Sequence, residues 1–233
     1  MLGGTGGLGR EIARALGQLG ARIDVHGRSQ DGLIEALGSF RGDGILAEGT
    51  AFPLVSIADA GPLFSRAAAA DILAAAWGPF LQKPLHDTTV GDWEGMASFN
   101  LALPGALVSS AVAGMRARGW GRILLLGGTR TDAIRGYRTN AAYAAAKTGL
   151  GVLAKSVAAS YSGDGVAALV LCPGFVGTEY LDPVRAAELS GKTPLGRLTD
   201  PRDLGDWAAD LLALEPPFWN GAVLTADEGL FAW

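Results

Sequence analysis

The stretch that decides the fold is Gly3-Gly-Thr-Gly-Gly-Leu-Gly-Arg10-Glu-Ile-Ala-Arg-Ala-Leu16, a glycine-rich turn that leads directly into a helical pattern. Glycines let the backbone turn tightly and approach a pyrophosphate, which then sits at the positive end of the helix. A helix over about residues 8–19 and a strand over residues 21–26 are expected after the turn. Such a turn, helix and strand predict a phosphate-binding loop, although a merely flexible N-terminal loop is the alternative interpretation.

The rest of the chain alternates short apolar runs with longer helical patterns, which is typical of a parallel sheet covered by helices. We therefore predict an α/β fold with a doubly wound, Rossmann-like parallel sheet, helices on both faces and one domain over residues 1–233. Only Met1 and Leu2 precede the first glycine. Either residues upstream complete the first strand in the natural protein, or Met1–Gly4 form a minimal strand. Further strands are expected at 45–54, 71–76, 122–126, 166–171 and 222–225, and further helices at 92–118, 139–162 and 201–214.

The composition excludes several classes of protein. Hydrophobic residues make up 49% of the 233 residues, the net charge is −4 and the sequence pI is about 5.2. An acidic chain lacks the electrostatic footprint of a nucleic-acid binder. The single cysteine, Cys172, lies in an apolar run and suits a reducing cytoplasm. No apolar run long enough to span a bilayer and no metal site are expected.

Tyr143 and Lys147 are candidate catalytic residues because they stand four positions apart in a helical pattern. At this spacing the two side chains lie on one face of a helix, one turn apart. A cation there favours the ionised phenol, so we expect the pKa of Tyr143 to be lowered from its usual value near 10. A phenol tuned in this way can exchange a proton near neutral pH.

Taken together, these motifs resemble the short-chain dehydrogenase/reductases over nearly the whole chain. The pattern Gly3-x-x-x-Gly7-x-Gly9 resembles the cofactor loop of that family, and Tyr143-x-x-x-Lys147 resembles its catalytic pair. Asn100 stands where the family has a helix asparagine that holds a proton-relay water. Residues 173–178 resemble the segment that contacts the nicotinamide, and residues 196–203 and 220–229 resemble C-terminal signatures.

The resemblance implies hydride transfer between a nicotinamide and a small-molecule carbonyl or alcohol, with Tyr143 as general acid/base. Lys147 would support the phenol and bind the nicotinamide ribose, and Thr178 would hold the carboxamide. Arg28 follows the second strand where an acid would favour the free ribose 2′-hydroxyl, so NADP(H) is favoured over NAD(H). The alternative is an SDR-like dinucleotide-binding protein with little or no catalysis, acting as a sensor or partner subunit. The implied cofactor contacts are Gly3, Gly7, Leu8, Gly9, Arg28, Ser29, Lys147, Pro173, Gly174, Val176 and Thr178.

The chain departs from the family pattern at the catalytic serine. Gly128 takes the most natural alignment with that serine, and the neighbouring Thr129 carries a hydroxyl that could replace it. A hydroxyl bonded to a developing oxyanion can be worth about 3–4 kcal/mol, so its loss should slow an enzyme without necessarily abolishing catalysis. The fourth-strand signature also differs, reading Ala75-Ala-Trp-Gly78, and the acid that usually contacts adenine is absent after the third strand.

Two further expectations concern the substrate and the assembly. Arg130, Arg135 and Arg138 precede Tyr143 in a loop that borders the substrate pocket of the family, where they could pair with an anionic group or simply face solvent. Residues 178–198 are expected to form an irregular or partly helical lid. The helices at about 92–118 and 139–162 are apolar on nearly every face, which predicts a homodimer or homotetramer built through them.

Overall fold

The computed structural model describes residues 1–231, and they fold into two compact units. The first unit comprises Met1–Pro53, Pro173–Pro216 and the residues from Ala226 onward, and the second comprises Leu54–Cys172 and Pro217–Thr225. The prediction of one domain over residues 1–233 stays a prediction, and residues 232–233 lie outside the described part.

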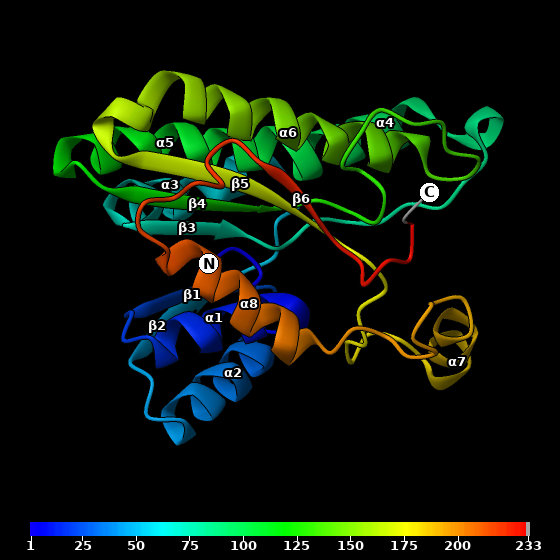
Figure 1. Ribbon diagram of the computed structural model, residues 1–233, viewed down its shortest axis with the longest axis horizontal. Helices are drawn as coiled ribbons and strands as arrows, with labels where there is room; N and C mark the ends of the chain where they lie inside the picture. The colour runs from blue at the N-terminus through cyan, green and yellow to red at the C-terminus, as the bar shows by residue number, and fades with distance from the viewer. Residues whose placement is uncertain (232–233) are drawn as a thin grey trace. The chain divides into compact units, whose positions relative to one another are not determined.

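The first unit is built on two parallel strands, β1 (Ile23–Gly27) and β2 (Ala47–Ala51), with Ile23 opposite Ala47. Its helices α1 (Gly7–Gln18) and α8 (Pro201–Ala213) pack so closely that a Cβ at Gly205 would lie 2.8 Å from the backbone of Glu11. Arg14 also links the two helices, because its guanidinium pairs with Glu11 of α1 and with Asp206 of α8. The helices of this unit are α1 (Gly7–Gln18), α2 (Gln30–Gly42), α7 (Pro183–Ser190) and α8 (Pro201–Ala213) (Figure 1).

In place of the expected minimal strand over Met1–Gly4, a single residue pairs with β1. Leu2 forms a parallel bridge with His26, the last but one residue of β1. The amide of His26 donates to the carbonyl oxygen of Met1 at 2.9 Å, and the amide of Gly3 donates to the carbonyl oxygen of His26 at 3.1 Å. A single bridging residue therefore connects directly into the glycine turn.

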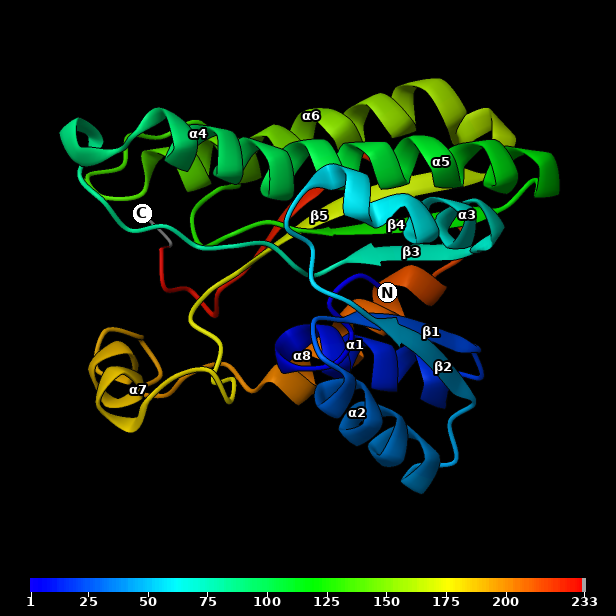
Figure 2. The same cartoon turned by 180° about the vertical axis from the view of Figure 1, so that it is seen from behind.

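The second unit contains a four-stranded sheet in the order β3-β4-β5-β6, in which β3, β4 and β5 run parallel. Figures 1 and 2 show α5 and α6 lying along one face of these strands. Every residue of β4 is buried, and Ile123, Leu124 and Leu125 are fully enclosed. The strands are β3 (Ile72–Ala75), β4 (Gly121–Leu126), β5 (Val166–Pro173) and β6 (Val223–Ala226), and the helices are α3 (Gly61–Ala69), α4 (Val90–Ala97), α5 (Leu103–Arg118) and α6 (Ala141–Tyr161).

The helical run Val90–Arg118 corrects one expectation, because by length and composition alone it is apolar enough to cross a membrane. It consists of α4, a π-helical segment at Ser98–Ala102 and α5. One side of α5 is buried through residues such as Leu103, Leu107 and Ala111, and α3 packs against it. We therefore interpret the run as core helix of a globular unit.

Two further segments can be compared with the predicted elements: one helix that was not predicted and one segment that is partly helical as expected. Helix α2 was not predicted, because Gly32 and Gly38 weaken its helical pattern; Ser29 begins it by accepting a hydrogen bond from the amide of Gly32 at 3.4 Å. Residues 178–198 are partly helical as expected, with α7 surrounded by turns. The prediction that this 178–198 segment acts as a lid stays a prediction.

Candidate active site

The predicted site residues fall into two groups, one in each unit, and each group has its own geometry. Asn100, Thr129, Tyr143 and Lys147 belong to the second unit. The glycine turn, Arg28, Ser29 and residues 173–178 belong to the first unit, with the nucleotide contacts expected of them.

Tyr143 is held in the first turn of α6 against the end of the central strand β4. The alanines around it let the helix pack closely, and Ala142, Ala144 and Ala146 are buried. The ring of Phe80 meets the phenol edge-on, with 5.0 Å between the ring centroids. The phenol is therefore fixed by packing on one side and by β4 on the other.

Gly128, the residue aligned with the missing serine, lies directly against the Tyr143 phenol. A Cβ at Gly128 would be 2.7 Å from Oη and 2.8 Å from Cε1 of Tyr143, closer than real Cβ atoms come to such neighbours. The backbone of Gly128 is not in the left-handed region, so space and not φ favours glycine here. No side chain fits at this position while the phenol keeps its place.

The turn that carries Gly128 is closed by Thr131, a residue that the sequence analysis missed. Its hydroxyl accepts from the amide of Gly128 at 2.8 Å and donates to the carbonyl oxygen of the same residue at 2.9 Å. Thr131 is 2% exposed, and its Oγ1 lies 3.6 Å from the Sγ of Cys172. A threonine three residues after a glycine is a turn signal that could have identified it. The role proposed for Thr129 stays a prediction.

Lys147 does not act on the phenol in the way the sequence predicted. Its Nζ donates to the carbonyl oxygen of Leu126 at 2.8 Å, at the end of β4. Burial raises the pKa of Tyr143 to about 12, and burial lowers the pKa of Lys147 to about 8. The expected lowering of the Tyr143 pKa was therefore wrong for this arrangement, because burial of the phenol disfavours its charged form.

Asn100 lies in the π-helical segment, a wide turn of the kind often found at functional sites. The side chain is fully buried, and its Nδ2 donates to the carbonyl oxygen of Pro79 at 2.9 Å. Its Oδ1 is buried without a hydrogen-bond partner and points at Gly78, where a Cβ would overlap it. An unpartnered buried carbonyl is costly, so Oδ1 is well suited to accept from a water molecule.

In the first unit, the glycine turn forms an anion-binding helix start. Gly6 is the N-cap of α1 and offers no side-chain cap, and Gly7 has a φ of 52°, which favours glycine. The amide of Gly7 donates to a carboxylate oxygen of Glu179 at 2.8 Å. This carboxylate stands in for an anionic group, so the residues present fit the phosphates of a dinucleotide. Of the other predicted contacts here, Gly3 turns the chain at φ 74°, Gly9 is buried and Leu8 is half-buried.

The residues expected to bind the ribose and the nicotinamide lie in different local environments. Arg28 is exposed just after β1, while Ser29 uses its hydroxyl to cap α2. Thr178 reaches the glycine turn, because its Cγ2 would lie 3.6 Å from a Cβ at Gly7. Pro173 ends β5, Gly174 packs on Asp227, and Val176 forms a parallel bridge with Thr199.

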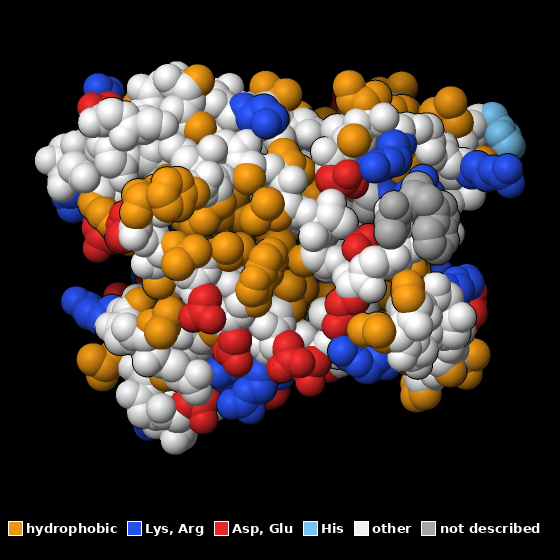
Figure 3. All heavy atoms as spheres, viewed as in Figure 1, with side chains coloured by type: hydrophobic (Ala, Val, Ile, Leu, Met, Phe, Trp, Pro, Cys, Tyr) orange, Lys and Arg blue, Asp and Glu red, His pale blue; other side chains and the backbone are white. Residues whose placement is uncertain are grey.

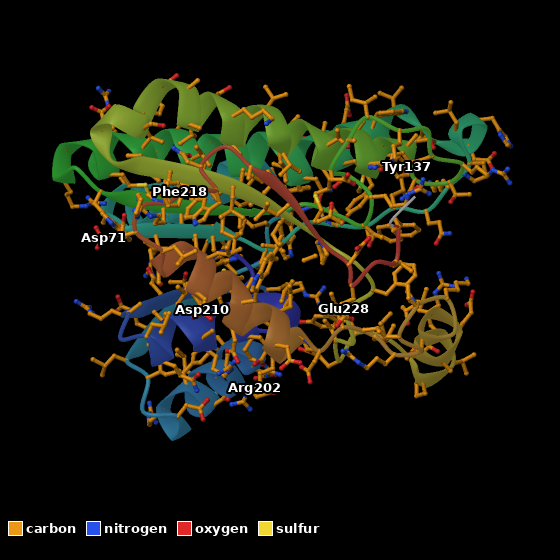
Figure 4. All side chains as sticks on the ribbon, in the orientation of Figure 1. Asp71, Tyr137, Arg202, Asp210, Phe218 and Glu228 are labelled. Carbon is orange, nitrogen blue, oxygen red and sulfur yellow. The ribbon has the colours of Figure 1, made fainter. Side chains whose placement is uncertain are left out.

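The C-terminal signatures hold the base of the 178–198 segment. Arg197 donates to the carboxylate of Glu228 at 3.0 Å, and Thr199 donates to its other oxygen at 3.0 Å. Glu228 is labelled in Figure 4. A pocket beside them is lined by Gly177, Arg197, Leu198, Thr199, Asp200, Pro201 and Asp203. It contains none of the candidate catalytic residues, so we do not assign the chemistry to it.

The arginines that precede Tyr143 are placed as follows. Arg135 forms an ion pair with Asp132 at 2.6 Å and donates to the carbonyl oxygen of Arg130 at 3.0 Å, so it is engaged within its own loop. Arg138 is exposed.

Among residues 1–231, no group of three or more histidine, cysteine or acidic residues could hold a metal ion.

Comparisons with known proteins cover nearly the whole chain. A family model described as enoyl-(acyl carrier protein) reductase matches residues 57–231. The chain is 29% identical over 241 residues to 2-dehydro-3-deoxy-D-gluconate 5-dehydrogenase of Formosa agariphila, covering 99% of this chain and 90% of the relative.

Solved structures share the fold throughout. A crystal structure provisionally described as a gluconate dehydrogenase from Agrobacterium tumefaciens matches with a TM-score of 0.89 at 28% identity, covering 100% of this chain and 94% of the other. A 3-oxoacyl (acyl-carrier-protein) reductase from A. tumefaciens C58 with NADP bound matches with a TM-score of 0.87 at 27% identity, covering 97% and 91%. The predicted Rossmann-like α/β class is thereby confirmed.

Proposed function

Because this chain belongs to the short-chain dehydrogenase/reductase family, whose named relatives are dehydrogenases and reductases, one of them with NADP bound, we propose that it transfers a hydride between NADP(H) and a small carbonyl or alcohol substrate. The observation that carries the proposal is the half-buried Tyr143 phenol packed against Gly128, on the same helix as the buried Lys147, whose Nζ binds the end of β4. The named relatives support sugar acids related to gluconate as the first substrate class to test.

Tyr143 acts as the proton donor in the direction of reduction. With a pKa of about 12, the phenol is protonated at neutral pH and ready to give its proton to the carbonyl oxygen. Lys147, held on the carbonyl oxygen of Leu126 and mostly cationic at pH 7 with a pKa of about 8, is assigned to the nicotinamide ribose. The bound nicotinamide supplies or accepts the hydride.

Asn100 is assigned to holding the water molecule through which the phenol regains its proton. Its unpartnered Oδ1 supports a role as acceptor for a water molecule, which relays a proton from solvent to the phenolate. Gly128 leaves no hydroxyl for the substrate oxygen, and we keep Thr129 as the candidate replacement. The glycine turn, Arg28 and Thr178 are assigned to the nucleotide.

The test is NADPH oxidation against a panel of keto sugar acids and other carbonyls, with Tyr143→Phe as the inactive variant. Tyr161→Phe, on the same helix but half-buried near its end, is the matched control and should keep wild-type rates. NADPH binding without turnover of any substrate, unchanged by Tyr143→Phe, would contradict the proposed reaction and favour a binding protein. Equal affinities for NADPH and NADH in the wild type and in Arg28→Ala would remove the assigned cofactor preference.

We further propose a cytoplasmic homodimer or homotetramer that uses the faces of α5 and α6. Val152 on α6 is 70% exposed, and Figure 3 shows mostly uncharged side chains over this helix. A contiguous exposed apolar patch on a helix marks an interaction surface. Analytical ultracentrifugation of the wild type and Val152→Glu tests this, since a monomeric wild type would contradict it.

A further inference from the structure

The N-terminus of α1 is occupied by a carboxylate of the chain itself. Glu179, just after Thr178, accepts a hydrogen bond from the amide of Gly7 at 2.8 Å. The same oxygen lies 3.9 Å from the guanidinium of Arg10, one turn further along α1. A negative group at this end of a helix is stabilised by the helix dipole and by free backbone amides.

The neighbouring Tyr180 covers the same turn. A Cβ at Gly6 would overlap its Oη, and a Cβ at Gly7 would lie 3.0 Å from its Cε2. The absence of side chains at both glycines therefore makes room for residues 179 and 180. These are the same glycines that a pyrophosphate needs for close approach to the backbone.

From this overlap we propose that Glu179 is a built-in competitor for the dinucleotide phosphates, and that cofactor binding must displace Glu179 and Tyr180 from the glycine turn. This inference rests on the proposed function, because it assumes that the turn binds NADP(H). Two anions cannot share the amide of Gly7, and a retained carboxylate would repel the phosphates. Binding of the cofactor is thereby coupled to movement of the 178–198 segment.

The contact is suited to reversible exchange. The Glu179 side chain is 45% exposed and Tyr180 is 72% exposed, so neither is locked in place by packing. Arg10 keeps a second partner, Glu35, at 3.1 Å when Glu179 leaves. A ligand that binds only the displaced state loses affinity in proportion to the population of the occupied state.

The experiment measures NADPH affinity by nicotinamide fluorescence in the wild type, Glu179→Gln and Glu188→Gln. Glutamine keeps the size of the side chain and removes its charge. Glu188 is the matched control, because it is an exposed glutamate of the same segment that pairs with Arg185 and Lys192 and lies in α7. We expect Glu179→Gln to bind NADPH roughly two- to tenfold more tightly, which is the range of a carboxylate at a helix N-terminus. Glu188→Gln should bind like the wild type.

A second measurement, the stability of the protein without nucleotide, tests whether Glu179 stabilises the N-terminus of α1. Without nucleotide, Glu179→Gln should have a lower urea midpoint than the wild type, because α1 loses its anionic partner. Tighter binding together with lower stability supports the proposal. If the wild type and Glu188→Gln bind NADPH and Glu179→Gln binds no more tightly, the competitor role is overturned while the proposed function stands. If none of the three proteins binds NADPH or NADH, both fall.

Discussion

Substitution of Gly128 by alanine tests whether the site is built around the missing side chain. The new Cβ would lie 2.7 Å from Oη, 2.8 Å from Cε1 and 3.1 Å from Cζ of Tyr143, while ordinary contact begins at 3.4 Å. The hydroxyl must therefore retreat by about 0.7 Å. Phe80 meets the ring edge-on at 5.0 Å and resists the movement.

The magnitude follows from two separate effects. Overpacking a well-filled site costs about 1–3 kcal/mol, so we expect the free energy of unfolding to fall by that amount. A catalytic group displaced by about 1 Å can lose on the order of 100-fold in rate, so kcat/KM should fall by roughly 10- to 100-fold. Urea denaturation and NADPH-linked assays measure the two effects independently.

The controls isolate the space around the phenol. Gly136→Ala lies in the same loop with nothing within 4 Å of its added Cβ, and it should change neither quantity. Phe80→Ala gives the ring room to move, so the stability cost of Gly128→Ala should shrink in the double variant. A Gly128→Ala protein as stable and as active as the wild type would refute the reasoning. Gly128→Ser carries the same added Cβ, so a gain in activity there would show that the hydroxyl outweighs the crowding.

Three further predictions concern other parts of the fold. Thr131→Val removes the hydroxyl that is hydrogen-bonded to the amide and the carbonyl oxygen of Gly128, so the free energy of unfolding measured with urea should fall by about 1–3 kcal/mol. An unchanged value would mean that other contacts stabilise this turn. Burial lowers the pKa of Lys147 to about 8 in the folded protein, against 10.5 for an ordinary lysine, so the unfolded chain binds more protons between these two pH values. The free energy of unfolding of the wild type should therefore rise from pH 7 to pH 10, relative to that of Lys147→Met, by about 2–3 kcal/mol. The same pH dependence of stability in both proteins would contradict the burial argument. Gly205→Ala should destabilise the protein by about 1–3 kcal/mol, because its Cβ meets the α1 backbone, whereas Gly38→Ala in open space should stabilise it by about 0.5–1 kcal/mol; equal thermal midpoints would refute the close packing of α1 and α8.

Much of the fold follows from local pattern. The buried strand at 122–126 and the helix at 139–162 were predicted within a residue or two, because uniform apolar runs and alanine-rich segments leave little choice. Helix α2 was missed, since its stability comes from the Ser29 cap and from burying Leu33, Ala36 and Phe40, not from propensity.

The helical placement of the candidate residues could be predicted from the sequence, but their electrostatics could not. The sequence places Tyr143 and Lys147 on one helix face, but burial of each group depends on chain far away in sequence. Desolvation therefore reversed the expected direction of the Tyr143 pKa. The contact between Glu179 and Gly7 joins residues 172 positions apart, and no spacing rule connects such a pair.

The π-helical segment at Ser98–Ala102 changes the rotation between the two helices on either side of it. Its wider turn holds one residue more than an α-helical turn, and each residue of an α-helix turns by about 100°. The 29-residue apolar run is therefore not one regular α-helix, because the wide turn changes the rotation between α4 and α5. Deleting a single residue there would restore a regular α-helix and rotate the buried side chains of α5 away from their contacts. A one-residue deletion at this point should therefore destabilise the fold more than a one-residue deletion in an exposed loop.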